Sequence, residues 1–393
     1  MIRSAARKEE KKAVTPLDRP NLPEEGSART ADSLASLRAL VLQEHQRHWG
    51  VFGFRPEWSF ELKPMAHLEG ENAGKYLVSF FSKEGAPQKT VFLKRYHHPQ
   101  IDAATIENEF QGIRIAHEAF APTPRFRVPQ PYGRLPEEKI LFMEYCPSVS
   151  LKKVLFRPIR LSRFFLLHRD RKRLVESVAE AGRLLAAFQG IPPERHPSGG
   201  KETGEEIVLR YERQCLRHLQ LCRKAGVPES LVIQMERSLF RRLEQGGGLQ
   251  TVLQHSDFAP WNVMVGARSF YLTDFQNCTT GLAGYDAAFF HCALELLLRY
   301  RTADHALIAE LQSIFLSEFL RSGSAGKGGQ AAPAAEAMEV KERLPCFDLF
   351  RLMHMTYFTQ SVFCAPPGPS YETFYAVPLR KFMVDWFQHY LEG

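Results

Sequence analysis

The sequence predicts an α+β fold with two lobes, a small β-rich lobe followed by a large helical lobe. Short runs of β-branched and aromatic residues lie between residues 59 and 145, which indicates strands. Beyond Pro147, apolar residues recur at helical spacing, and one short β-hairpin over 263–272 interrupts them. The 393-residue chain is therefore expected to divide into a disordered tail over 1–31, an N-lobe over 32–146 and a helical C-lobe over 147–393.

The tail and the N-lobe differ in composition. Residues 1–31 are charged and rich in Pro and Ala, which is typical of disorder, and their start lacks the apolar stretch of a signal peptide. In the N-lobe, the turn residues Lys83 to Pro87 separate two apolar runs, so we expect these runs to pair as antiparallel strands. The expected elements, in order, are a helix over 33–49, strands over 59–65, 76–81 and 90–96, a helix over 102–120 and a strand over 140–145.

The C-lobe is expected to consist of helices and a single hairpin, whose strands are joined by a turn at Gly266 to Ser269. A segment rich in Gly, Ala and Ser near 322–336 predicts a flexible linker. No run of eighteen apolar residues occurs, so no segment is predicted to span a membrane. The expected helices cover 161–189, 205–225, 228–245, 283–320, 338–360 and 371–391.

Cysteine usage and net charge exclude several classes of protein. The seven cysteines are scattered singly, without a C-x-x-C pair, which argues against a disulfide framework or a structural zinc site. Reduced thiols are typical of a cytoplasmic protein, which is the location that we expect. The net charge of +7 suits an anionic ligand without selecting a nucleotide, a nucleic acid or an acidic surface.

Three polar residues flank the β-hairpin of the C-lobe. Asn262 precedes its first strand and Asp274 follows its second, and antiparallel strands joined by a tight turn bring these two ends side by side. Because Mg²⁺ prefers oxygen ligands, we expect Asn262 and Asp274 to hold Mg²⁺. Asp257, on the loop entering the same end, is placed to accept the proton of an attacking hydroxyl in phosphoryl transfer. Each residue alone is more often a turn former, but their joint spacing favours a catalytic site.

A second set of candidate residues lies in the N-lobe. Lys94 ends an apolar strand, in the pattern of a lysine that reaches the phosphates of a nucleotide. Glu109 is expected to pair with it because it lies on the helix stripe that faces the sheet, and Glu107 is the competitor. A strand lysine is otherwise an ordinary surface group. The segment 67–75 contains two glycines that allow backbone amides to approach phosphates, although a plain hairpin turn explains it equally well.

The candidate residues occur in the order found in kinases: Lys94, Glu109, Asp257, Asn262 and Asp274. The loop from His255 to Asn262 resembles that of the aminoglycoside phosphotransferase and lipopolysaccharide-kinase branch of the protein-kinase-like superfamily, which usually reads H-G-D-x-x-x-x-N. Ser256 stands where that branch has Gly. The resemblance covers about residues 62–290 and implies a two-lobed protein-kinase-like fold that uses ATP and Mg²⁺.

The resemblance adds further expectations about single residues. The strand 141–145 looks like the one that leads into the hinge of a kinase, so Glu144 and Tyr145 are expected to meet the adenine of ATP through their backbone. Asp286 is expected to be mainly structural, because Tyr285-Asp286-Ala287 resembles the Y-D-L-A turn of the branch. The other expected nucleotide-binding residues are Lys94, Glu109, Asn262 and Asp274.

A basic and aromatic segment spans residues 152–173. It contains nine Lys or Arg residues and one acid, Asp170, with Leu and Phe residues among them. A solvated helix face is the simplest interpretation. The functional interpretations are an anionic acceptor or peripheral contact with an anionic membrane at its inner face. Nucleic-acid binding has no recognition motif to support it, and the sequence predicts no oligomeric state.

These observations favour an ATP- and Mg²⁺-dependent phosphotransferase that acts on a hydroxyl group of a small molecule or glycolipid. A glycolipid acceptor, such as a core sugar of lipopolysaccharide, is preferred because of the segment 152–173 and because no acidic run suits a cationic acceptor. A protein Ser/Thr kinase is less favoured, since no A-P-E ends an activation segment between Asp274 and Tyr285. A non-catalytic nucleotide-binding scaffold is disfavoured because all the key side chains are present.

Overall fold

The structure is a computed structural model and describes residues 25–65, 73–161, 168–199, 202–244, 250–299, 305–324, 344, 346–364, 380–388 and 390. The chain divides into two compact units, Met1–Pro56 and Glu57–Gly393. Within the described residues, no helix is long and apolar enough to cross a membrane.

The first unit contains helix α1 (Glu25–Arg47) and the short 3-10 helix η1 (Trp49–Phe52). Within this unit Trp49 packs against Phe54, with ring centroids 5.3 Å apart. The predicted helix is present, but the predicted tail over 1–31 extends too far, because α1 already begins at Glu25. Good helix formers (Ala and Arg) follow this residue, which explains the earlier start. Residues 1–24 lie outside the described part of the chain.

The second unit begins with a five-stranded antiparallel sheet in the order β1-β2-β3-β6-β5. Alternating side chains of β2 and β3 form its buried face, among them Val78, Phe80, Val91 and Leu93. The predicted antiparallel pairing of the second and third strands is confirmed, with Ser79 opposite Thr90. The strands are β1 (Ser59–Pro64), β2 (Ala73–Phe81), β3 (Pro87–Tyr96), β5 (Pro131–Leu135) and β6 (Ile140–Glu144).

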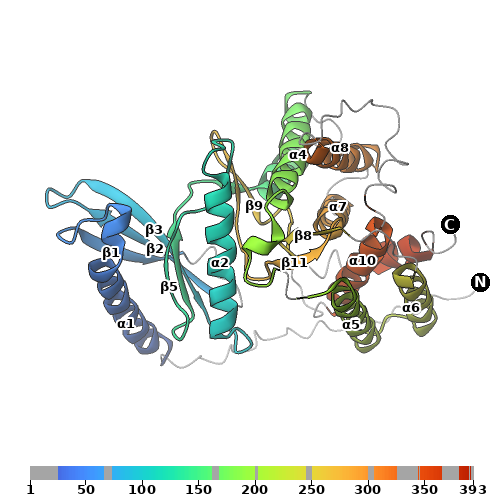
Figure 1. Cartoon of the computed structure of the whole chain (residues 1–393), viewed down its shortest axis with the longest axis horizontal. Coiled ribbons are helices and arrows are strands. Elements are labelled where there is room, and N and C mark those ends of the chain that lie inside the picture. The colour runs from blue at the N-terminus through green and yellow to red at the C-terminus, as the bar shows by residue number, and fades with distance from the viewer. Residues whose placement is uncertain are drawn as a thin grey trace, which may run out of the picture. The chain divides into compact units, whose positions relative to one another are not determined.

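Helix α2 (Ala103–Phe120) packs against β5, as Figure 1 shows. Asp102 caps the helix, since its carboxylate accepts a hydrogen bond from the Thr105 N–H at 2.8 Å. The buried stripe of α2 includes Ile106, Glu109 and Ile113, which follow helical spacing. The helix therefore turns Glu109 away from solvent, as its periodicity predicted.

Helices dominate the rest of the second unit, with α4 against α8, α7 against α10, and α5 against both α6 and α10. The predicted helix 161–189 contains α4, which begins at His168, and α3 is a helix before it that the sequence did not predict. The predicted helix 283–320 is instead two helices, α7 and α8. Helix α8 continues to Ser324, so the predicted linker near 322–336 begins too early, and its remainder lies outside the described residues. Residues 380–388 are helical, within the last predicted helix. The helices are α3 (Leu151–Leu161), α4 (His168–Gln189), α5 (Gly204–Lys224), α6 (Glu229–Glu244), α7 (Tyr285–Arg299), α8 (His305–Ser324) and α10 (Phe347–Cys364).

The C-lobe contains more strands than the single predicted hairpin. The hairpin itself, β9 (Val263–Val265) and β10 (Phe270–Leu272), is confirmed, and β4 (Phe126–Arg127) and β7 (Val149–Ser150) extend it into a four-stranded sheet. A separate pair, β8 (Thr251–Gln254) and β11 (Thr279–Leu282), frames the loop between them. Strands of two to four residues are too short for side-chain alternation to show in a sequence.

Candidate active site

The open end of the β9–β10 hairpin brings Asp257 and Asn262 together. The amide Nδ2 of Asn262 donates hydrogen bonds to the backbone carbonyl of Asp257 at 2.9 Å and to its Oδ2 at 2.7 Å. With Nδ2 engaged in this way, Oδ1 is the side-chain atom of Asn262 left as an acceptor. Burial, reinforced by the charge of Asp274, raises the pKa of Asp257 to about 7. Asp257 is thus poised to exchange a proton near neutral pH.

Lys94 joins the N-lobe sheet to the same end of the hairpin. Its Nζ donates to Glu109 Oε1 at 3.1 Å and to Asp274 Oδ1 at 2.8 Å. Burial opposes the charge of Lys94, but the carboxylates of Asp274 and Glu109 outweigh it and hold the pKa of Lys94 well above its usual value. Glu107 pairs instead with Arg134, so the structure gives Lys94 the partner that the helix stripe predicted.

Asp274 lies between the buried lysine and solvent. Burial opposes its ionisation, but the neighbouring Lys94 ammonium outweighs that effect and lowers the pKa of Asp274. Its side chain remains 41% exposed, whereas that of Glu109 is 1% exposed. Asp274 can therefore reach a ligand from solvent, and Glu109 cannot.

Asp286, at the start of α7, holds the loop that contains Asp257 through two hydrogen bonds. Its two carboxylate oxygens each accept a hydrogen bond at 2.8 Å, from the backbone N–H groups of His255 and Ser256. Ser256 has φ 66, in the left-handed region that favours glycine. Ser256 therefore adopts a backbone conformation that is strained for serine but not for glycine. The two hydrogen bonds to Asp286 stabilise this conformation.

The stretch Glu144–Tyr145 is less open to a ligand than the sequence suggested. The N–H of Glu144 donates to the Gln130 carbonyl at 2.8 Å, and the N–H of Tyr145 donates to the Thr90 carbonyl at 3.3 Å. Both N–H groups are therefore used within the protein. A nucleotide here has to use the carbonyl groups of the stretch or a neighbouring N–H, so contact with adenine stays a prediction.

Lys75 is a further candidate residue that the sequence did not indicate. It lies opposite Lys94 in the β2–β3 pairing, and burial together with the charge of Lys94 lowers its pKa. The charge of Asp274 acts on it in the opposite sense. The alternation of side chains along β2 could have indicated which face of the sheet Lys75 lies on. Its position opposite Lys94 depends on the pairing register of β2 and β3, which the sequence does not give. Residues 66–72, most of the candidate glycine loop, lie outside the described residues.

A cavity of about 370 Å³ adjoins Asp257. Among its described lining residues Asp257 is the only carboxylate, and the one guanidinium, Arg210, pairs with Glu202 at 2.9 Å. Its walls also include the hydroxyl, amide and aromatic side chains Tyr211, Gln214, Gln254, Ser256, Asn277, Thr279, Tyr285, Phe289 and Tyr357. The walls come from α5, α7 and α10 as well as the loop, so no local motif indicated this cavity.

One hydrogen-bond chain fixes the polar floor of this cavity. The Leu282 N–H donates to the Tyr211 hydroxyl at 3.1 Å, and that hydroxyl donates to Gln254 Oε1 at 3.0 Å. The amide of Gln254 is therefore oriented with Nε2 as its remaining donor, and within the described residues Nε2 has no acceptor. Gly281 makes room for this amide, since a Cβ there would lie 1.9 Å from Oε1.

The basic and aromatic segment 152–173 is only partly exposed. Val154 and Leu155 on α3 are buried, so part of its apolar content belongs to the core. Arg171 forms an ion pair with Glu310 at 2.5 Å. Side chains over 157–170 lie outside the described residues. Within the residues that are described, no cluster of three or more His, Cys, Asp or Glu side chains could hold a metal ion.

Comparison with known proteins supports the fold and a family. The model of a phosphotransferase enzyme family matches residues 72–316. No curated protein matches the sequence significantly. Choline kinase from Cryptosporidium parvum Iowa II has a TM-score of 0.53 at 13% identity, over 90% of this chain and 94% of that one. An ethanolamine kinase from Plasmodium vivax has a TM-score of 0.51 at 11% identity, over 88% of both chains.

A third similar structure is an amicoumacin kinase in complex with AMP-PNP and Ca²⁺. Its TM-score is 0.51 at 15% identity, over 93% of this chain and 96% of that one. At such identities the similarity shows the fold alone. The predicted α+β, two-lobed kinase-like fold is therefore confirmed.

Proposed function

Because the chain belongs to the phosphotransferase enzyme family, we propose that it transfers a phosphoryl group from ATP to a hydroxyl group of a small molecule or glycolipid, with Mg²⁺ as cofactor. One observation carries the proposal. Lys94, held by Glu109, contacts Asp274 at 2.8 Å, and the Asp257–Asn262 pair lies at the same end of the hairpin. A phosphate-orienting cation, two oxygen ligands and a proton acceptor therefore converge.

The residues present fit a magnesium ion. Asn262 Oδ1 and the partly exposed carboxylate of Asp274 are hard oxygen donors, and Mg²⁺ commonly takes few protein ligands beside water and phosphate oxygens. When bound, Mg²⁺ neutralises charge on the transferred phosphoryl group. Lys94 contributes a second positive charge, and Glu109 fixes its direction.

Asp257 is assigned the role of proton acceptor. Its carboxylate is held by Asn262 and by a hydrogen bond from the Trp261 side chain, and it faces the 370 Å³ cavity. A pKa of about 7 matches a group that must take a proton from a hydroxyl near neutral pH. The acceptor hydroxyl is therefore proposed to enter from this cavity.

The lining of the cavity supports an acceptor rich in hydroxyl groups. Amide and hydroxyl side chains beside aromatic rings suit a sugar, whereas one carboxylate offers little to a polycation. A glycolipid sugar, such as one in a lipopolysaccharide core, satisfies both features. In that case we propose a cytoplasmic enzyme whose segment 152–173 contacts the anionic inner face of the membrane.

The proposal is tested by incubating the protein with ATP, Mg²⁺ and a metabolite or glycolipid extract, and by searching for a phosphate-sized mass gain. Asp257→Asn keeps the shape of the side chain but removes its basicity, so transfer should fall about a hundred- to ten-thousandfold. Nucleotide affinity, measured by calorimetry, should barely change, because Lys94, Glu109, Asn262 and Asp274 are retained. A wild-type protein that transfers nothing contradicts the proposal, and equal loss of binding and transfer contradicts the role of Asp257.

A further inference from the structure

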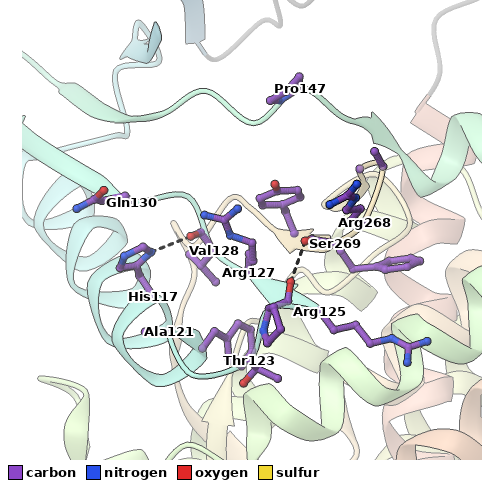
Figure 2. A pocket seen from close by; sticks show the side chains of 16 residues that line it. His117, Ala121, Thr123, Arg125, Arg127, Val128, Gln130, Pro147, Arg268 and Ser269 are labelled. Carbon is purple, nitrogen blue, oxygen red and sulfur yellow. Dashed lines mark hydrogen bonds between the residues drawn. The ribbon is translucent and has the colours of Figure 1, made fainter. Parts of the chain in front are cut away.

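A second, larger cavity lies at the turn end of the β9–β10 hairpin. It has a volume of about 1180 Å³ and is shown in Figure 2. One wall is the last turn of α2 with the connection that follows it, including His117 and Arg125. The opposite wall is the hairpin turn Gly266–Ser269, and Pro147 borders a third side. The catalytic candidates Asp257, Asn262 and Asp274 are absent from this described lining.

The charge of this cavity is one-sided. Its described lining includes three arginines, Arg125, Arg127 and Arg268, and neither an aspartate nor a glutamate. Figure 2 shows Arg127 and Arg268 on opposite sides of the opening between the two walls. The Arg125 side chain runs away from these two, towards α4, where it contacts Glu180. Two guanidinium groups therefore face the hollow, and no carboxylate lines it among the described residues, which attracts an anion.

The acids around the cavity neutralise these arginines only in part. Arg125 contacts Glu180, but Glu180 also pairs with Arg183, so one carboxylate serves two guanidiniums. Arg127 lies 3.7 Å from Glu144, at the long end of an ion pair, and keeps 45% of its side chain exposed. Arg268 is exposed, and no acid among the described residues lies within ion-pair distance of it.

The walls are tied together, so the cavity does not require rearrangement to form. The Ser269 hydroxyl donates to the Pro124 carbonyl at 2.8 Å, and the Phe270 N–H donates to the Arg125 carbonyl at 2.9 Å. Strands β4 and β10 pair in parallel here, with Phe270 opposite Phe126. These bonds fix the backbone of all three arginine-bearing stretches relative to one another.

We propose that this cavity binds a small molecule that carries phosphate groups, held by Arg127 and Arg268. Guanidinium forks match the oxygens of a phosphate, and two of them suit a multiply charged anion better than a single carboxylate. The Tyr271 ring, 5.6 Å from the Arg127 guanidinium, offers a flat apolar surface beside the charges. The cavity is slightly larger than the roughly 300–1,000 Å³ that is typical of small-molecule pockets, so it has room for such a ligand.

This site is separate from the proposed reaction site but is connected to it. The hairpin strands β9 and β10 run from the arginine cavity to Asn262 and Asp274, a length of about 10 Å for three residues. Arg127 also reaches Glu144, on the stretch expected to meet adenine. An anion that draws Arg127 away from Glu144 therefore changes the contacts of the stretch that is proposed to bind adenine.

Calorimetry of the full-length protein with inorganic pyrophosphate, without nucleotide or metal, tests the proposal. Arg127→Gln and Arg268→Gln should each weaken binding about tenfold, since each removes a charge-assisted hydrogen bond. Arg237→Gln, an exposed arginine on α6 with the same change of charge, should leave binding unaltered. Circular dichroism verifies that each variant is folded. Arg268 is exposed in a turn, so Arg268→Gln is expected to fold normally.

Pyrophosphate can also reach Lys94, so Lys94→Met is included as a second control. Binding that is lost with Lys94→Met and kept in the two arginine variants overturns the proposal, as does no binding at all. Titration with phosphatidylcholine vesicles that contain phosphatidic acid separates a lipid headgroup from a soluble phosphate ester. Binding to either probe supports the site only if Arg268→Gln weakens it.

Discussion

Lys94 is buried and Asp257 is half-buried beside Asp274, and their surroundings have opposite effects on charge. Lys94 has two carboxylates within 3.1 Å, which stabilise its ammonium. Asp257 has an amide and an indole as partners and a second acid as neighbour, so its pKa rises to about 7. The side proposed to bind nucleotide thus preserves a fixed charge, while the side proposed to bind the acceptor leaves a carboxylate free to change its charge. Fixed charge suits phosphate binding, and a near-neutral pKa suits proton transfer.

The comparison depends most on Asp274, which bonds to Lys94 and whose charge raises the pKa of Asp257. Asp274→Ala should reduce phosphoryl transfer on the order of a thousandfold, because it removes a proposed metal ligand whose stabilisation is realised mainly in the transition state. Transfer assays at several Mg²⁺ concentrations, with circular dichroism to verify folding, measure this effect. A folded Asp274→Ala protein with normal turnover would falsify the metal assignment.

On the side proposed to bind nucleotide, we expect three variants to differ in how much phosphoryl transfer they lose. Lys94→Met should lower transfer on the order of a hundredfold, because it removes a donor directed at developing charge. Glu109→Gln should cost about tenfold, as it loses one charge-assisted hydrogen bond but leaves Asp274 beside the lysine. Glu107→Gln is the matched control, since Glu107 pairs with Arg134 instead. Steady-state rates and nucleotide affinities for all three test the order, and damage from Glu107→Gln alone contradicts it.

The acceptor side should respond to acid through His354, which lines its cavity. Burial lowers the pKa of His354 to about 3, below that of a histidine in an unfolded chain. Below pH 6.5 the unfolded chain therefore binds a proton that the folded protein excludes. The stability contributed by neutral His354 is complete above pH 6.5 and is lost as the pH falls towards 3.

His354→Gln should accordingly reduce the pH dependence of the free energy of unfolding between pH 6 and 4 by up to about 1.4 kcal/mol per pH unit. Urea denaturation at several pH values gives this slope, which is independent of any uniform destabilisation by the variant. His48→Gln, at an exposed position 4.0 Å from Glu44, is the comparison and should change the slope less than His354→Gln does. Equal slopes for wild type and His354→Gln count against a neutral buried histidine.

The smallest expected effect concerns the left-handed backbone at Ser256. Ser256→Gly relieves strain of about 1–2 kcal/mol but adds about 0.5–1 kcal/mol of unfolded-state entropy, so stability should rise by up to about 1.5 kcal/mol. Ser79→Gly, in the extended strand β2, should lower stability instead. Thermal denaturation of both variants compares the signs, and a destabilised Ser256→Gly protein shows that the hydroxyl matters more than the backbone.

The parts of the site that the sequence predicted are those fixed by short-range geometry. Asn262 and Asp274 flank one tight hairpin, so their approach follows from antiparallel pairing. Glu109 follows from helix periodicity over a long, well-capped helix. Asp257 follows from its place on the loop that enters the same hairpin.

The features that the sequence did not predict depend on tertiary packing. Arg210 and His354 line one cavity from helices far apart in the chain, and β4 pairs with β10 across more than a hundred residues. Lys75 required the register of the sheet. The ends of α1 and α8 were misplaced because Ala, Gly and Ser in a charged or repetitive context are compatible with both helix and coil.

The 2.8 Å bond between Lys94 and Asp274 has a consequence for how ligands bind together. In the proposed roles a phosphate lies beside Lys94 and a cation beside Asp274. Either ligand alone competes with the ion pair for one of its charges, whereas both together supply a new partner to each. If these roles hold, nucleotide and magnesium are thermodynamically linked, and each should increase the affinity for the other by the same factor. The ion pair would then favour the complete metal–nucleotide complex over either component.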